Sequence, residues 1–267
     1  MSDAGRGRIA RQWAALRAAG RPALIPYVTA GYPSAEATVA TLRALADEGA
    51  DFVEVGIPFS DPLADGPVIQ RASFAALQGG TTVRGVLDMV RAADLSIPVV
   101  LFSYVNPVLR YGLARFVDDA RQAGASGLLL TDLPVGADPP LEAAIGTSGL
   151  DRIPLVALTT TRARLAAALE GASGFVYLIS RLGVTGGGTV IGGEVAAAVA
   201  AVRHATDLPI AVGFGIGTGA EAAAAAELAD GVVVGSALVR RMAEGEAAVR
   251  RFVAELRRAL DAATVAP

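Results

Sequence analysis

The chain has 267 residues, a formal net charge of −3 and 53% apolar residues, which is enough to form one large buried core. No uninterrupted apolar run reaches the ~18 residues that a membrane span needs, and the arginine-rich start lacks the apolar segment of a secretion signal. We therefore expect a cytoplasmic protein that binds no membrane, and the lack of a basic cluster argues against nucleic acid as a partner.

Short runs of β-branched residues alternate with helical Ala/Leu/Arg patterns along the chain. Such strands, separated by helices, imply right-handed crossovers and a parallel sheet. Eight units over this length favour a closed eight-stranded (β/α)8 barrel, the TIM barrel, over an open sheet. The expected strands are Ala23–Thr29, Phe52–Gly56, Pro98–Tyr104, Gly127–Asp132, Ile153–Leu158, Gly174–Ser180, Pro209–Gly213 and Gly231–Gly235, and the helices between them include Ala35–Glu48, Val83–Ala93, Ala114–Ala123, Thr161–Leu169, Gly193–Ala205 and Ala220–Glu227.

The two ends of the chain complete this arrangement. Residues Met1–Gly20 predict an extra N-terminal helix over the bottom of the barrel, and Gly245–Ala263 predicts the closing helix. No linker or low-complexity stretch divides the chain, so residues 1–267 are expected to form a single TIM-barrel domain. In such barrels catalytic groups lie at the C-terminal ends of strands and in the loops that follow.

Two loops are longer than the usual ~2–6 residues of a crossover. The segment Ile57–Gln70 follows the second strand, and the glycine-rich segment Gly183–Gly193 follows the sixth. These two loops are the first places in which to look for a functional site.

The second strand carries a carboxylate among apolar residues. Side chains alternate along a strand, so Phe52, Glu54 and Gly56 share one face and the flanking valines take the other. Valines suit the helix-packed outer face, which places Glu54 in the barrel mouth. Burial would raise the pKa of Glu54 into a range suited to proton transfer; the alternative is a structural Glu paired with an arginine.

Asp65 lies eleven residues further on, in the loop after the second strand. Pro62 and Pro67 stiffen this loop, and Gly66 lets the backbone turn beside the carboxylate. Asp61 is a candidate for anchoring the loop or facing a partner. Both aspartates could instead only cap turns, and the residue types alone leave this alternative open.

Three glycine signals follow the sixth, seventh and eighth strands. They include Gly186, then Gly215, then Gly235 with Ser236, which opens a helix. Barrels often bind phosphate at the loops after the last two strands, where backbone N–H groups and a helix dipole hold the anion. A dinucleotide fingerprint fails because Thr218 stands where a third glycine is needed, and three unrelated tight turns remain the alternative.

The residue types that are absent narrow the chemistry. The chain has no Cys, which excludes a thiol nucleophile, a thiolate metal site and disulfides. Every basic residue is Arg, so no lysine imine can form and the chain cannot itself anchor pyridoxal phosphate. The single histidine, His204, ends a predicted helix and is expected at the surface. Acid–base work therefore falls to Asp, Glu, Tyr or Ser.

Several segments resemble the alpha chains of tryptophan synthase, in order from about Arg8 to Leu260. The resemblance is carried by EVGIPFSDPLADGP (54–67), PYVTAGYP (26–33), YLISRLGVTG (177–186), GFGI (213–216) and GSA (235–237). It implies Glu54 and Asp65 as catalytic residues and places the substrate phosphate against Gly186, Gly215, Gly235 and Ser236. It also implies that Tyr27, Phe102, Leu129, Tyr177, Thr185 and Phe214 surround the rest of the substrate.

The reaction implied by the resemblance is a carbon–carbon lyase reaction of L-tryptophan biosynthesis. Indole-3-glycerol phosphate would undergo retro-aldol cleavage to indole and glyceraldehyde 3-phosphate. The resemblance implies no cofactor or metal in this chain, and a beta subunit that carries pyridoxal phosphate in an alpha2-beta2 heterotetramer. Pro58 and Asp61 would then contact the beta subunit.

Three alternatives stay open from the sequence. A free-standing indole-3-glycerol-phosphate lyase would share every catalytic residue and need no beta subunit. A sugar-phosphate isomerase would also use two carboxylates in a phosphate-binding barrel, but carboxylates are absent from Ala23–Thr29 and Ile153–Leu158. A binding barrel without enzymatic activity would not respond to the substrate.

Overall fold

The computed structural model describes residues 6–134, 136–179, 193–213 and 215–263. In this part of the chain nine strands form one parallel sheet in the order β5-β4-β3-β2-β1-β9-β8-β7-β6. The strands are β1 (Ala23–Thr29), β2 (Val53–Gly56), β3 (Val99–Ser103), β4 (Ala125–Leu130), β5 (Asp151–Arg152), β6 (Leu155–Ala157), β7 (Val176–Ile179), β8 (Ile210–Gly213) and β9 (Gly231–Val234).

The strand count differs from the expected eight because the fifth strand is broken. Its two parts, β5 and β6, are the two ends of the sheet order and are separated only by Ile153 and Pro154. The Ile153 N–H donates to the Leu128 carbonyl of β4 (3.0 Å), whereas the Pro154 carbonyl accepts from Tyr177 N–H of β7 (3.0 Å). Proline has no N–H to continue the ladder. The broken strand thus completes the ring, and the expected barrel is confirmed.

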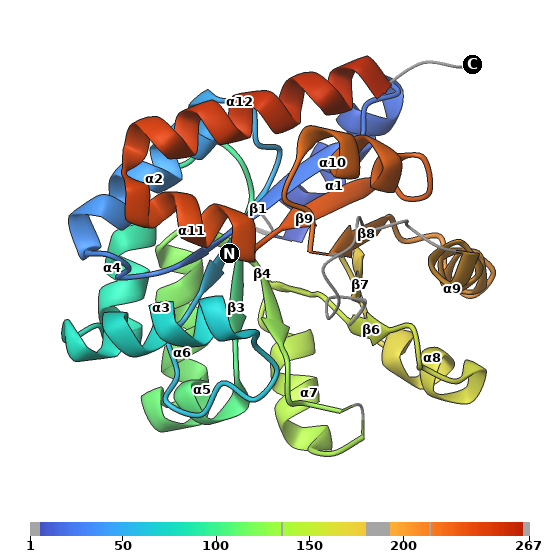
Figure 1. Ribbon diagram of the computed structural model, residues 1–267. Coiled ribbons are helices and arrows are strands. Elements are labelled where there is room, and N and C mark those ends of the chain that lie inside the picture. The colour runs from blue at the N-terminus through green and yellow to red at the C-terminus, as the bar shows by residue number, and fades with distance from the viewer. Residues whose placement is uncertain (1–5, 135, 180–192, 214, 264–267) are drawn as a thin grey trace.

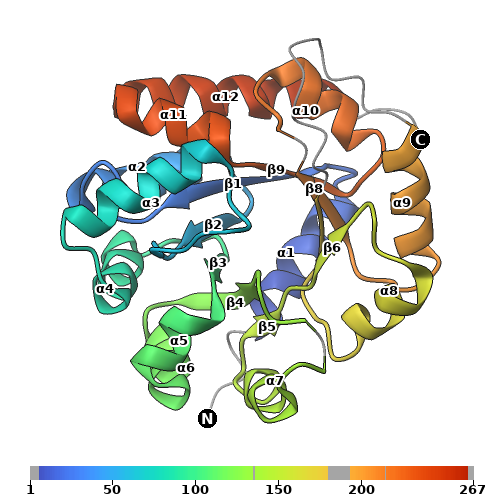
Figure 2. The ribbon, with the colours of Figure 1, turned by 60° about the horizontal axis from the view of Figure 1, so that its bottom comes forward.

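Helices surround this ring (Figures 1 and 2). The helices expected from the sequence agree with the observed helices to within a few residues at each end. The helices are α1 (Arg6–Ala18), α2 (Ala35–Asp47), α3 (Pro67–Gln78), α4 (Val83–Ala93), α5 (Val105–Tyr111), α6 (Leu113–Gln122), α7 (Pro139–Gly146), α8 (Arg162–Leu169), α9 (Gly193–Arg203), α10 (Gly219–Ala226), α11 (Ser236–Glu244) and α12 (Glu246–Ala263).

The predicted loop Ile57–Gln70 is too long, because α3 begins inside it. Pro67 is the first residue of α3, a position where the missing N–H costs nothing because it would have no helical partner. The start of α7 has the same explanation: its first two residues are prolines, and they directly follow the capping residue Asp138. Proline at a helix start is easily misread as a helix breaker.

The interior of the barrel is filled by one side of each strand. Phe52 and Phe175, which directly precede β2 and β7, are fully buried there with Val100 of β3. Val53 and Val55 belong instead to the core between strands and helices, so the predicted alternation along the second strand is confirmed.

Helix α1 covers the N-terminal end of the barrel, as predicted (Figure 2). The Trp13 ring lies 4.9 Å from the Phe52 ring and 5.7 Å from the Phe175 ring, between ring centroids. Arg8 donates to the backbone carbonyls of Leu95 (3.0 Å) and Ser96 (2.9 Å), next to the start of β3. Apolar burial and these bonds together close this end of the barrel.

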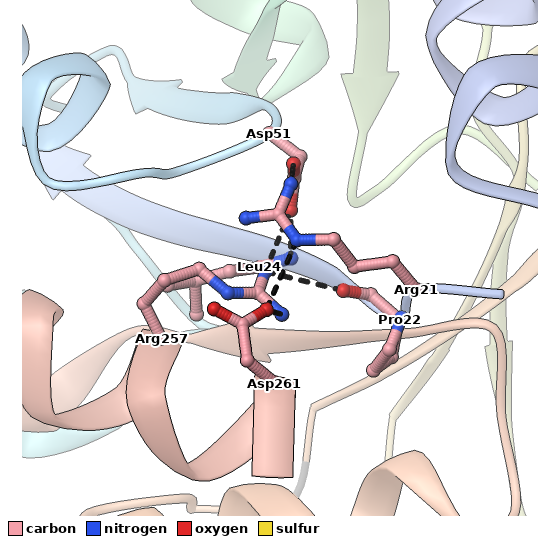
Figure 3. A network of polar contacts seen from close by, with 6 residues as sticks. All are labelled: Arg21, Pro22, Leu24, Asp51, Arg257 and Asp261. Atoms are coloured by element: carbon pink, nitrogen blue, oxygen red, sulfur yellow. Dashed lines mark hydrogen bonds and ion pairs between the residues drawn. The ribbon is translucent and has the colours of Figure 1, made fainter. Parts of the chain in front are cut away.

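A buried ion-pair network ties α12 to the first two strands (Figure 3). Asp51 accepts hydrogen bonds from the Leu24 N–H (2.8 Å), Arg257 (3.0 Å) and Arg21 (3.1 Å). Arg257 also lies 2.7 Å from Asp261. Burial raises the pKa of Asp51, while the Leu24 N–H and the two arginines oppose that rise. A buried charge pair of this kind is costly to break on one side only.

Within the described residues, none of the helices has both the length and the apolar character needed to cross a membrane.

Candidate functional site

Glu54 lies on the inner face of β2 and is completely buried. Neither of its carboxyl oxygens has a hydrogen-bond partner within the described part of the chain. Burial alone raises the pKa of Glu54 to about 8, because a charged carboxylate in an apolar interior loses its hydration. Among the described residues, no arginine pairs with Glu54, which argues against the alternative of a structural ion pair. With a pKa of about 8, Glu54 is mostly protonated at neutral pH.

Asp65 is half-buried in the loop between β2 and α3. The Tyr104 hydroxyl donates a 2.9 Å hydrogen bond to Asp65 Oδ2 and accepts one from the Ala64 N–H (3.0 Å). Burial raises the pKa of Asp65 to about 6, and the hydrogen bond from Tyr104 opposes that rise. The two carboxyl groups thus differ in pKa because their surroundings differ.

Tyr104 was not among the residues predicted for the site. It follows β3 directly and precedes α5, and its ring packs against Phe59 with centroids 5.1 Å apart. Burial, followed by the charge of Asp65, raises the pKa of Tyr104, so its hydroxyl stays a proton donor. Its position at the C-terminal end of a strand was the one available signal in the sequence.

Two tyrosines line the mouth of the barrel, each seated over a glycine. Tyr27 of β1 is paired in register with Glu54, and a Cβ on Gly56 would lie 2.1 Å from its hydroxyl oxygen. Tyr177 of β7 takes the same position over Gly213 of β8, where a Cβ would lie 2.5 Å from its hydroxyl oxygen. Only glycine leaves room for these rings.

The pKa values of the two tyrosines respond to both carboxyl groups. Burial raises the pKa of Tyr27 first, and the charges of Asp65 and Glu54 add to it. The pKa of Tyr177 rises for the same reasons, with Glu54 the largest charge contribution. The two tyrosines and the two carboxyl groups therefore lie near enough at the barrel mouth to influence one another electrostatically.

The described apolar residues predicted for substrate contact lie beside the two tyrosines. Phe102 of β3 meets Tyr27 edge-on, with ring centroids 5.3 Å apart. Leu129 of β4 is fully buried, pairs in register with Phe102 and belongs to the interior cluster that also contacts Tyr177. Phe102 and Leu129 thus form an apolar floor.

The predicted phosphate residues that the structure describes lie at the ends of adjacent strands. Gly215 follows β8 with a φ of +72°, and Gly235 follows β9, the neighbour of β8. Ser236 is the first residue of α11, whose cap residue Gly235 contributes no side-chain hydrogen bond. The first N–H groups of a helix have no partner inside it, so the start of α11 is a suitable place for an anion to accept hydrogen bonds.

Some predictions fall on residues that the structure does not describe. Thr185, Gly186 and Phe214 lie outside the described residues, as does the predicted glycine-rich loop except for Gly193, the first residue of α9.

His204 is exposed just after α9, and its Nδ1 lies 2.7 Å from the Ala200 carbonyl oxygen, which confirms its predicted surface position. Among the described residues, no three His, Cys, Asp or Glu side chains lie together in a way that could hold a metal ion.

Comparison with known proteins identifies relatives over nearly the whole chain. The family model for the tryptophan synthase alpha chain matches residues 13–265. The tryptophan synthase alpha chain of Thioalkalivibrio sulfidiphilus is 48% identical over 264 residues, covering 95% of this chain and 99% of the relative. That of Gluconacetobacter diazotrophicus is also 48% identical, over 93% of this chain and 95% of the relative.

Solved structures give the same answer for the fold. A structure of tryptophan synthase from Mycobacterium tuberculosis matches with a TM-score of 0.88 and 42% identity, covering 95% of this chain and 98% of that one. The tryptophan synthase alpha subunit of Legionella pneumophila matches with a TM-score of 0.87 and 37% identity, covering 96% and 98%.

Proposed function

Because the chain belongs to the tryptophan synthase alpha chain family, we propose that it cleaves indole-3-glycerol phosphate to indole and glyceraldehyde 3-phosphate. The observation that carries this proposal is the buried, unpartnered carboxyl of Glu54 beside the Asp65–Tyr104 pair. The family points to the alpha chain, so the alternative of a free-standing lyase is not favoured; the isomerase and the inert barrel gain no support.

The chemistry requires a place for electrons. Cleavage of the bond between indole C3 and the glycerol carbon leaves an electron pair on C3, which the intact aromatic ring cannot accept. Protonation of C3 gives an indolenine whose cationic nitrogen takes up that pair. The protonated indole ring then serves as the electron acceptor, in place of the lysine imine that this chain cannot form.

Glu54 is suited to both proton transfers of this reaction. With a pKa of about 8 it starts as the neutral acid and donates its proton to C3. The resulting carboxylate takes the proton of the glycerol hydroxyl as the carbon–carbon bond breaks and the carbonyl forms. Glu54 ends as the acid it started as, so protons balance over one turnover. Well-placed general acid–base groups contribute typically ~10²–10⁴-fold.

Asp65 is suited to hold the charge that develops on the ring. The hydrogen bond from Tyr104 stabilises its ionised form, and an ionised carboxylate accepts from the indole N–H most strongly when that nitrogen is positive. Because the two pKa values differ, Glu54 can act as the acid while Asp65 is the anion.

The substrate phosphate fits the edge formed by Gly215, Gly235 and Ser236. The N–H groups at the start of α11, which have no partner inside the helix, and the helix dipole both favour a dianion. Gly186 and Thr185 belong to this proposal through the family resemblance alone.

We also propose a beta subunit as the partner, and it would carry the pyridoxal phosphate. Large apolar side chains are exposed near the Asp65 loop: Leu63 (76% exposed) within it, Phe74 (63%) on α3 and Leu109 (47%) on α5. Contiguous exposed apolar surface commonly marks a protein interface, and these three side chains would supply apolar contacts if the beta subunit covers this side of the chain. Asp61 is exposed and suits the contact predicted for it, whereas Pro58 is buried in this chain.

The test is to incubate the purified chain with indole-3-glycerol phosphate and quantify both products. We expect indole and glyceraldehyde 3-phosphate in equal amounts, and a kcat/KM that rises through about pH 6 as Asp65 ionises and falls through about pH 8 as Glu54 loses its proton. Titration with a tryptophan synthase beta subunit should raise turnover by ~5–150-fold. Full activity without any response to the partner would favour the free-standing lyase.

A further inference from the structure

A cavity of about 400 Å³ lies at the break in the barrel wall, and none of the residues proposed for catalysis lines it. Most of its lining lies on the outer side of the strands, but Ile153 and Leu155 also contact the interior of the barrel. The cavity opens between α7 and α8, which stand apart on either side of β5 and β6 (Figure 2). Its inner wall is the outer side of β4, where Leu128 and Leu130 point away from the barrel interior. The volume is in the range of small-molecule sites, roughly 300–1,000 Å³.

The break in the fifth strand helps to explain why this space is not filled. Neither α7 nor α8 is longer than eight residues, and β5 and β6 pair with different neighbours. On the α8 side the cavity is lined by Ala167 and Ala168, whose side chains are too short to reach across. Ile145 supplies the α7 side.

The charged groups around the cavity all have the same sign. Arg152 and Arg164 line it, and the described lining residues include no Asp or Glu. The Arg152 guanidinium donates to the carbonyls of Glu170 and Gly171, and within the described residues neither arginine pairs with a carboxylate. Thr131 and Thr160 add two hydroxyl groups.

From these features we infer that the cavity between α7 and α8 binds a small amphipathic organic anion. Its apolar body would lie against Leu130, Ile145 and Ala168, and its carboxylate or sulfonate would meet Arg164. A guanidinium offers paired donors that fit such a group. This inference does not depend on the lyase reaction, because none of the described residues proposed for that reaction lines the cavity.

A molecule bound in the cavity would contact residues next to those at the barrel mouth. Leu155 lines the cavity and is the register partner of Tyr177. Thr131 also lines it, and its N–H donates to the carbonyl of Ser103 (3.0 Å), the residue before Tyr104. A bound anion thus contacts the strand beside one tyrosine and the loop beside the other.

The experiment measures binding directly by calorimetry on the full chain, with 2-naphthoate as the probe and neutral 2-naphthamide as its matched ring. We expect 2-naphthoate to bind with a Kd below about 1 mM, and 2-naphthamide to bind at least about tenfold more weakly because it lacks the charge. Arg164→Glu should weaken 2-naphthoate binding by about tenfold or more. Arg162→Glu, the same charge change on the same helix outside the cavity, should change it less than about twofold.

A crystal structure with 2-naphthoate locates the site independently of any variant. Density between α7 and α8 supports the inference; density confined to the barrel mouth, binding at crystal concentration only, or equal effects of Arg164→Glu and Arg162→Glu would overturn it. Ala168→Phe, which fills the cavity, should abolish binding while circular dichroism stays unchanged. If this variant does not fold, the comparison of Arg164→Glu with Arg162→Glu still tests the inference.

Discussion

Replacing Glu54 by Gln should stabilise the protein while it removes activity. The wild-type carboxyl has a pKa of about 8 in the folded chain and an ordinary value of 4.5 when exposed. A group whose folded pKa is raised binds more protons in the folded state, so stability falls as the pH rises from the unfolded value to the folded one. Gln has a similar shape and cannot ionise.

The size of the effect follows from the two pKa values. Between about pH 5 and pH 8 the wild type should lose ~3 kcal/mol of unfolding free energy relative to Glu54→Gln. For a domain of this size that corresponds to a difference of about 6–12 °C in Tm at pH 8. All other titrating groups are present in both proteins, so the comparison isolates Glu54.

The assay is denaturant and thermal unfolding of both proteins across this pH range, with indole release measured on the same samples. We expect the two stability curves to meet near pH 5 and to separate as the pH rises, while turnover of the variant drops by ~10²–10⁴-fold. Parallel stability curves would mean that Glu54 is not an unpaired buried carboxyl, and the assigned pKa would be wrong.

Three further substitutions, one of them given with its control variant, test other contacts. Tyr104→Phe removes the hydrogen bond that favours ionised Asp65, so the acidic limb of the kcat/KM profile should move to higher pH while the fold is kept. Gly56→Ala should raise KM and cost ~1–3 kcal/mol by overpacking, whereas Gly66→Ala, whose Cβ meets nothing within 4 Å, should be nearly neutral. Arg257→Met should cost up to ~3–5 kcal/mol, because buried Asp51 then keeps only the half-exposed Arg21 and the Leu24 N–H as partners, and kcat should not change.

Matched controls accompany these substitutions. Tyr111→Phe removes a surface tyrosine–carboxylate hydrogen bond, to Asp119, and should leave the pH profile unchanged; a shift equal to that of Tyr104→Phe would remove the role given to Tyr104. Arg91→Met breaks an exposed pair with Asp88 and should cost less than ~1 kcal/mol. If Arg257→Met costs no more, the buried network contributes little.

Much of the fold was predictable because its signals are local. Alternation along 52–56 placed Glu54 inside the barrel before any coordinates, since a strand with valines on one side has only one face left for a carboxylate. The first strand, Ala23–Thr29, and the helix Val83–Ala93 have the predicted bounds. These elements are set by short-range periodicity.

The remaining features depend on contacts between distant segments. The fifth strand breaks where Ile153 bonds to β4 and Pro154 bonds to β7, and the apolar run 153–158 does not reveal this change of neighbour. The start of helix α3 was missed because Pro67, its first residue, stands in a sequence that resembles a loop. Tyr104 reaches Asp65 across 39 positions, and no local pattern predicts that bond.

The most direct test of the central claim is the rate of indole release by the isolated chain and by its Glu54→Gln and Asp65→Asn variants. Glu227→Gln at the end of α10 and Asp61→Asn in the same loop as Asp65 serve as controls with the same atom changes. The account predicts that each site variant folds like the wild type but loses ~10²-fold or more in kcat, and that the controls stay within about twofold of the wild type. Near wild-type turnover by a folded Glu54→Gln or Asp65→Asn variant would contradict it.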